Sequence, residues 1–84
     1  MCETALVDLV TIKEESDGTI DIIIPPDIFW DCVECFGANR LNASFSFLFG
    51  RYVARMNTVT SRQIREMLGN WKPSIEIRAQ VHCV

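Results

Sequence analysis

The four cysteines and the single histidine are the residues of this chain best suited to chemistry. Cys32 and Cys35 have the Cys-x-x-Cys spacing of a zinc knuckle or a redox pair. His82 and Cys83, near the end of the sequence, could complete a Cys₃His metal site. Adjacent strand residues point to opposite faces, however, and the first two cysteines lie in an apolar segment, not at an exposed helix start. The pattern therefore favours buried, inert cysteines over a metal module or a redox pair.

A basic segment, residues 51–78, could instead bind nucleic-acid phosphates. Its Gln-Ile, Leu-Gly and Ser-Ile pairs, spaced between positions 63 and 75, resemble a helix-turn-helix. Arg65 stands where that motif has a small residue, and the last part of the segment alternates like a strand. A nucleic-acid-binding regulator is therefore an alternative function, with phosphate contacts from Arg62, Arg65, Lys72 and Arg78.

The first half of the chain has the element order of a ribbon-helix-helix dimer. A strand at 19–24 would be followed by helices at 27–36 and 44–56. In that fold the outward residues of the strand read bases, but here the outward candidate is Asp21, with Asp17 beside it. Phosphates would repel both carboxylates. The order is therefore compatible with a dimer architecture and not with a DNA reader.

Few residues of this chain are suited to catalysis. The one histidine lies near the end of the sequence, and neither a Gly-rich phosphate loop nor a Ser/His/Asp set stands out. Asp27, Asp31 and Glu34 share one helix edge, which is typical of a solvated stripe. We therefore expect a protein that is not an enzyme and needs no cofactor.

Charge is divided between the two halves of the chain. Residues 1–50 carry nine acids and two bases, whereas residues 51–84 carry six bases and two acids, and the net charge is −3. Such asymmetry indicates an acidic or nucleic-acid partner for the basic half, or halves that face each other. The basic half therefore supplies the residues most suited to steering a partner.

Apolar content suggests what that partner is. The chain has 84 residues, enough for a single domain (1–84), and 49% of them are apolar, more than a small core needs. Apolar residues beyond the needs of a core usually end in an interface, which predicts a homodimer and a regulatory protein that binds another protein. The expected anchors are Trp30, Phe47 and Trp71, with a basic rim of Arg51, Arg55, Arg62 and Arg65.

The expected compartment is cytoplasmic. No stretch approaches the ~20 apolar residues that span a bilayer, and no basic region precedes an apolar run at the start, so no membrane association is expected. Cysteines in such a chain are more often reduced thiols than disulfides.

The pattern of the first half predicts a hairpin followed by a helix. Residues 5–13 are apolar and β-branched, Asp17-Gly18 is a hairpin turn signal, and residues 19–24 form the return strand. Ile20, Ile22 and Ile24 would share one face of it. A helix follows over 27–36, apolar over most of its circumference.

The second half predicts two more helices and a strand. Residues 44–56 carry an apolar stripe at helical spacing, although Phe45, Phe47 and Phe49 also alternate as in a strand. Thr60 and Gln63 form a capping box that begins a helix to residue 69. Residues 73–84 alternate and predict a final strand paired with the hairpin. The expected fold is α+β, with an N-terminal β-hairpin, about three helices and a C-terminal strand (ββαααβ).

Overall fold

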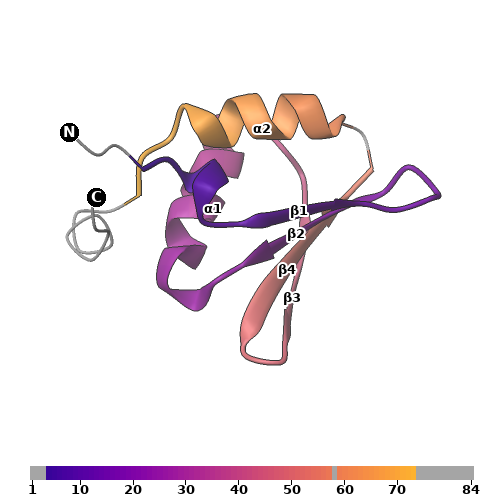
Figure 1. The fold of residues 1–84 in the computed structure, drawn as a ribbon, viewed down its shortest axis with the longest axis horizontal. Coiled ribbons are helices and arrows are strands. Elements are labelled where there is room, and N and C mark those ends of the chain that lie inside the picture. The colour runs from indigo at the N-terminus through magenta and orange to yellow at the C-terminus, as the bar shows by residue number, and fades with distance from the viewer. Residues whose placement is uncertain (1–3, 58, 74–84) are drawn as a thin grey trace.

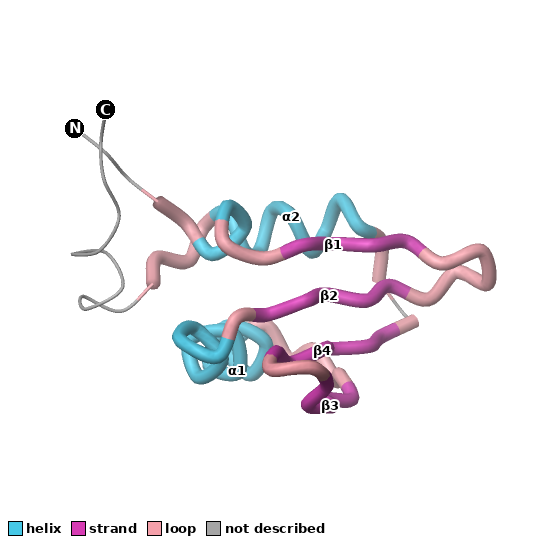
Figure 2. Tube along the Cα trace, turned by 60° about the horizontal axis from the view of Figure 1, so that its bottom comes forward, coloured by secondary structure: helices cyan, strands magenta, loops and turns pink. Residues whose placement is uncertain are grey.

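A four-stranded antiparallel sheet with two helices forms the described part of the chain, residues 4–57 and 59–73 of a computed structural model (Figure 1). The strands lie side by side in the order β1-β2-β4-β3 (Figure 2). The α+β class is therefore confirmed. The strands are β1 (Thr11–Glu14), β2 (Ile20–Ile24), β3 (Ser44–Leu48) and β4 (Arg51–Met56), and the helices are α1 (Phe29–Ala38) and α2 (Ser61–Gly69).

The predicted N-terminal hairpin is confirmed. Gly18 has a φ of 88°, and the Thr19 N–H donates to the Asp17 carboxylate at 2.9 Å, which fixes the turn between β1 and β2. The first strand is shorter than predicted because Leu6–Asp8 form a 3₁₀ helix, η1. There the Leu6 N–H donates to the Trp71 carbonyl at 2.9 Å and ties the start of the described chain to the end of α2.

The core lies between one face of the sheet and the two helices. Ile20, Ile22 and Ile24 all point to this face, as the alternation predicts, and Met56, Ala54 and Tyr52 of β4 are their direct partners. The helices supply the other half of the packed layer. Its buried helical side chains are Cys32, Cys35 and Phe36 from α1, and Ile64 and Leu68 from α2.

The helix predicted over residues 44–56 is wrong. This segment is the β3–β4 hairpin, which turns at Phe49 and Gly50 with φ values of 53° and 79°. Two positive φ values in a two-residue turn belong to the I′ class, whose twist suits a hairpin. Glycine destabilises a helix interior by roughly 1 kcal/mol relative to alanine, so Gly50 favours the turn. Because this second helix is replaced by a hairpin, the predicted ribbon-helix-helix order is also wrong.

The other two predicted helices are present. The chain passes from β2 through a 3₁₀ turn, η2 (Pro26–Ile28), into α1. The capping box of α2 is confirmed: the Gln63 N–H donates to the Thr60 hydroxyl at 3.1 Å, and the Thr60 N–H donates to the Gln63 side-chain oxygen at 2.8 Å. The predicted C-terminal strand covers residues 73–84, of which 74–84 lie outside the described residues. No helix in the described part of the chain has the length and apolar character to cross a membrane.

The sheet face opposite the helices is called the open face here, and it carries an ion pair between its two central strands. Asp21 and Arg55 are direct partners on β2 and β4, and they form a two-bond ion pair. Arg55 Nε donates to Asp21 Oδ1 at 2.8 Å, and its Nη2 donates to Oδ2 at 3.1 Å. These bonds to the guanidinium hold the pKa of the Asp21 carboxyl below its usual value of 3.8.

We expect Asp21→Asn to lower the free energy of unfolding by about 1 kcal/mol at pH 7, because a charged two-bond pair becomes a neutral contact. The depressed pKa stabilises the fold above pH 3.8, and this contribution is lost as the pH falls through the native pKa. The difference between Asp21→Asn and the parent protein should therefore shrink below pH 3.8. Urea unfolding at pH 7 and pH 2.5 measures it. Glu34→Gln, at an exposed position on α1, is the control and should change little at either pH.

Candidate functional site

The cysteine pair lies in the core. Cys32 and Cys35 are both fully buried, and the Cys35 thiol contacts the Met67 carbonyl oxygen at 3.8 Å. Burial raises the pKa of Cys32 to about 12 and that of Cys35 to about 11. Both groups are therefore neutral thiols at physiological pH, which is the opposite of what a redox pair needs.

The structure does not test the rest of the predicted metal site. His82 and Cys83 lie outside the described residues. Among residues 4–57 and 59–73, no group of three or more His, Cys, Asp or Glu side chains is placed to hold a metal ion. The interpretation of Cys32 and Cys35 as buried core residues is confirmed.

The predicted arginine rim is divided between two sides of the molecule. Arg51 and Arg55 are exposed on the open face of β4, and Arg62 and Arg65 are exposed on α2, which packs on the opposite face. Arg62 Nε also lies 3.9 Å from Glu66 Oε1. Of the remaining cations proposed for nucleic acid, Lys72 is exposed just beyond α2, and Arg78 is outside the described residues.

Large apolar side chains gather instead at the end of the molecule where β3 and β4 meet α1. Trp30 is 72% exposed, Phe47 60% and Phe49 90%. Scattered single apolar residues are normal on a protein surface, but a contiguous group marks an interaction site. This surface is called the aromatic edge, and its members are Trp30, Phe45, Phe47, Leu48 and Phe49.

Ring contacts connect three members of the aromatic edge, Trp30, Phe45 and Phe47, through Phe29 and Tyr52. Phe29, at the start of α1, stacks on Tyr52 of β4 with ring centroids 3.8 Å apart. Its edge contacts reach Trp30 at 5.2 Å and Phe45 at 5.5 Å. Phe47 meets the same tyrosine at 4.8 Å. Trp30 and Phe47, two of the predicted anchors, are therefore connected through the stacked pair beneath them.

The third predicted anchor, Trp71, lies elsewhere. Its side chain is half-buried against the core, and its carbonyl holds η1 through the bond from Leu6. Trp71 therefore packs against the core and is not part of the aromatic edge. Four of the seven predicted partner-binding residues lie in or near β3. Phe47 belongs to the strand and Trp30 to the aromatic edge, and Arg51 and Arg55 are the register neighbours of Leu48 and Ser44.

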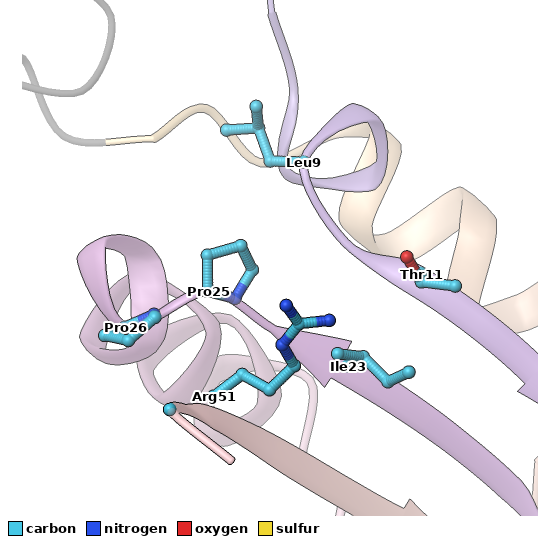
Figure 3. A pocket seen from close by; sticks show the side chains of 7 residues that line it. Leu9, Thr11, Ile23, Pro25, Pro26 and Arg51 are labelled. Carbon is cyan, nitrogen blue, oxygen red and sulfur yellow. The ribbon is translucent and has the colours of Figure 1, made fainter. Parts of the chain in front are cut away.

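A shallow hollow on the open face is the other feature of note (Figure 3). It has a volume of about 230 Å³, and the Arg51 side chain extends across it beside Ile23 and Pro25. Arg51 is the one charged residue of this lining, and no other lining residue is ionisable. The hollow is lined by Leu9, Thr11, Ile23, Pro25, Pro26, Gly50 and Arg51.

Comparison with protein-family models, curated proteins and solved structures finds no match to this chain. The site must therefore be interpreted from its own geometry. Sequence reasoning missed Phe45, Leu48 and Phe49, because it placed them in the buried stripe of a helix. The alternation of Phe45, Phe47 and Phe49 was the signal that could have found them.

Proposed function

We propose that this chain is a non-catalytic interaction module that binds a protein through the aromatic edge. The observation that carries the proposal is the gathering of five large exposed apolar side chains around one edge strand. Weighted by their exposed fractions, they offer on the order of 600 Å² of apolar surface, since an aromatic side chain buries roughly 150–250 Å². That is the size of the largest patches found on monomeric proteins, which are often functional.

The strand itself supports binding. All five residues of β3, Ser-Phe-Ser-Phe-Leu, are exposed, and the strand contains neither a charge nor a proline. Native proteins usually protect a sheet edge with charged residues, as the other edge here does with Lys13 and Glu14 of β1. An unprotected edge offers unpaired backbone groups to another chain.

The arginines of β4 complete the surface. Arg51 is the direct partner of Leu48, and Arg55 is the direct partner of Ser44, so one exposed arginine lies beside each end of β3; Arg55 is already paired with Asp21, so Arg51 is the one with charge to offer a partner. Arginine and aromatic side chains are the residue types that dominate binding energy at protein interfaces. Charges at a rim mainly increase the rate of encounter, so binding should weaken modestly with salt.

A photo-crosslinker tests this proposal. We replace Phe47 with p-benzoylphenylalanine in cells that produce the full chain, and use the same replacement of Arg62 on α2 as the matched control. We expect a discrete adduct at position 47 that protease removes and nuclease does not, and none at position 62. No adduct at position 47, equal adducts at both positions, or an adduct that nuclease removes would each contradict the proposal. Circular dichroism of both purified variants checks that they fold.

A further inference from the structure

We propose that the protein bound at the aromatic edge is a second copy of this chain. In this dimer, β3 of one copy pairs with β3 of the other in antiparallel orientation, and the two sheets join into one of eight strands. This inference rests on the proposed function and names the partner of the same site. Three properties of β3 support it: the direction of its backbone groups, its lack of charge, and the side chains that its pairing would bring together.

The backbone groups of β3 alternate between β4 and the open edge. Leu48 and Arg51 flank the two-residue turn, so they are the hydrogen-bonded pair that closes the hairpin. By alternation, Ser46 and Ser44 also direct their N–H and C=O groups toward β4. The N–H and C=O groups of Phe45 and Phe47 therefore point outward, to the edge where another strand could pair.

The outward N–H and C=O groups of two copies can pair with each other when a two-fold axis through Ser46 relates the two β3 strands. Phe45 of one copy then faces Phe47 of the other, and each such pair can exchange two N–H···O bonds. Ser46 faces Ser46, and Ser44 faces Leu48. An isologous contact of this kind closes after two copies, so it produces a dimer and not a fibre.

Charge does not oppose a second copy at this edge. β3 carries no charge, so the two-fold axis sets no like charges opposite each other. The nearest cations, Arg51 and Arg55, lie one strand further in. Three strand spacings, about 14 Å, would separate the β4 strands of the two copies. That distance exceeds the Debye length of about 8 Å at physiological ionic strength, so repulsion between the copies is weak.

The side chains brought together are aromatic. Phe45 and Phe47 of both copies would meet on the helix side of the sheet, and aromatic cross-strand pairs stabilise a sheet. Phe49, one residue beyond β3, would come beside Ala43 of the second copy. Weighted by their exposed fractions, Phe45, Phe47 and Phe49 offer roughly 400 Å² per copy, which is below the ≈ 800 Å² per partner of a standard interface. We therefore expect a dimer that dissociates on dilution.

A symmetric disulfide tests the register. We introduce Ser46→Cys in a chain that also carries Cys2→Ser and Cys83→Ser, because Cys32 and Cys35 are buried. Cα atoms facing across a non-hydrogen-bonded pair are about 4.5 Å apart, within the range that a disulfide spans. Oxidised glutathione should therefore link Ser46→Cys chains to one another. The matched control is Ser44→Cys, on the same strand and the same face, whose copies would be about 14 Å apart and should stay unlinked.

Sedimentation equilibrium of the parent chain and of Phe47→Lys measures the dimer itself. We expect a reversible monomer–dimer equilibrium in the parent and a dissociation constant raised at least about tenfold in the variant. Circular dichroism should show the same fold in both, since the Phe47 side chain is 60% exposed.

The outcomes separate this inference from the proposed function. A parent chain that stays monomeric at every concentration, or equal linking of Ser46→Cys and Ser44→Cys, overturns the second copy as partner. The proposed function would then still stand if the photo-crosslinker at position 47 gives an adduct with a different protein. An adduct of twice the chain mass supports both.

Discussion

Ile22→Ala is expected to lower the free energy of unfolding by about 3 kcal/mol. Ile22 is fully buried in the central strand β2, with Ile12 and Ala54 as its direct neighbours on β1 and β4. Truncation removes buried methyl groups and leaves a cavity that the surrounding strands and helices cannot close. Small domains are stable by roughly 0.05–0.15 kcal/mol per residue, so this one change removes a large part of the total.

The adjacent residue is a matched control. Ile23 has the same side chain and lies on the same strand, but it faces the open side of the sheet and is only half-buried between Thr11 and Val53. Ile23→Ala should therefore cost about 1 kcal/mol. Urea unfolding followed by circular dichroism compares the two variants. Equal losses, or a larger loss for Ile23→Ala, would contradict the assignment of the two faces.

The first half of the fold could be predicted because its signals are local. Asp17 and Gly18 determine the turn through their own conformations, and the alternation of Ile20, Ile22 and Ile24 orients β2 without reference to the rest of the chain. The capping box at Thr60 and Gln63 is equally local. Features that depend on a few neighbouring residues can be inferred from one sequence.

The β3–β4 hairpin could not be assigned in this way, because its pattern fits two periods. Phe45, Tyr52 and Met56 satisfy a helical stripe, and they also satisfy the alternation of two strands around a turn. A contact outside the segment determines its conformation. β2 lies between β1 and β4, and its backbone needs a partner on both sides. Only the turn at Phe49 and Gly50 allows this segment to provide that partner.

The hairpin, in place of the predicted helix over 44–56, also changes where the arginines of the second half lie. A single helix would carry Arg51 and Arg55 on the same kind of surface as Arg62 and Arg65. In the hairpin the first two lie on the open face, and Asp21 neutralises Arg55 there. Among the described residues, the cations of the basic half therefore form no single basic surface: Arg51 lies on the open face, and Arg62 and Arg65 lie on α2 on the opposite side. The aromatic edge, which lies beside Arg51, is the feature that singles out a binding site.

Phe49 is the residue whose conformation and exposure are hardest to explain by folding alone. Its φ of 53° lies in the left-handed region, which costs a side chain with a β-carbon roughly 1–2 kcal/mol. Its ring is 90% exposed, so little packing offsets that strain. Asparagine tolerates this conformation, and Asn-Gly is the preferred sequence of a type I′ turn. Phe49→Asn should therefore raise the free energy of unfolding of the monomer by about 1 kcal/mol.

The same substitution should weaken association through the aromatic edge, because it removes the most exposed ring of that surface. Phe49→Ala is the control: it removes the ring and keeps the strain, so it should weaken association without the gain in stability. Urea unfolding of dilute protein gives the first quantity and sedimentation equilibrium gives the second. If Phe49→Asn stabilised the fold and left association unchanged, Phe49 would have no part in the interface. A gain in folding stability together with a loss of association would show that a strained turn is retained because it presents an aromatic side chain for binding.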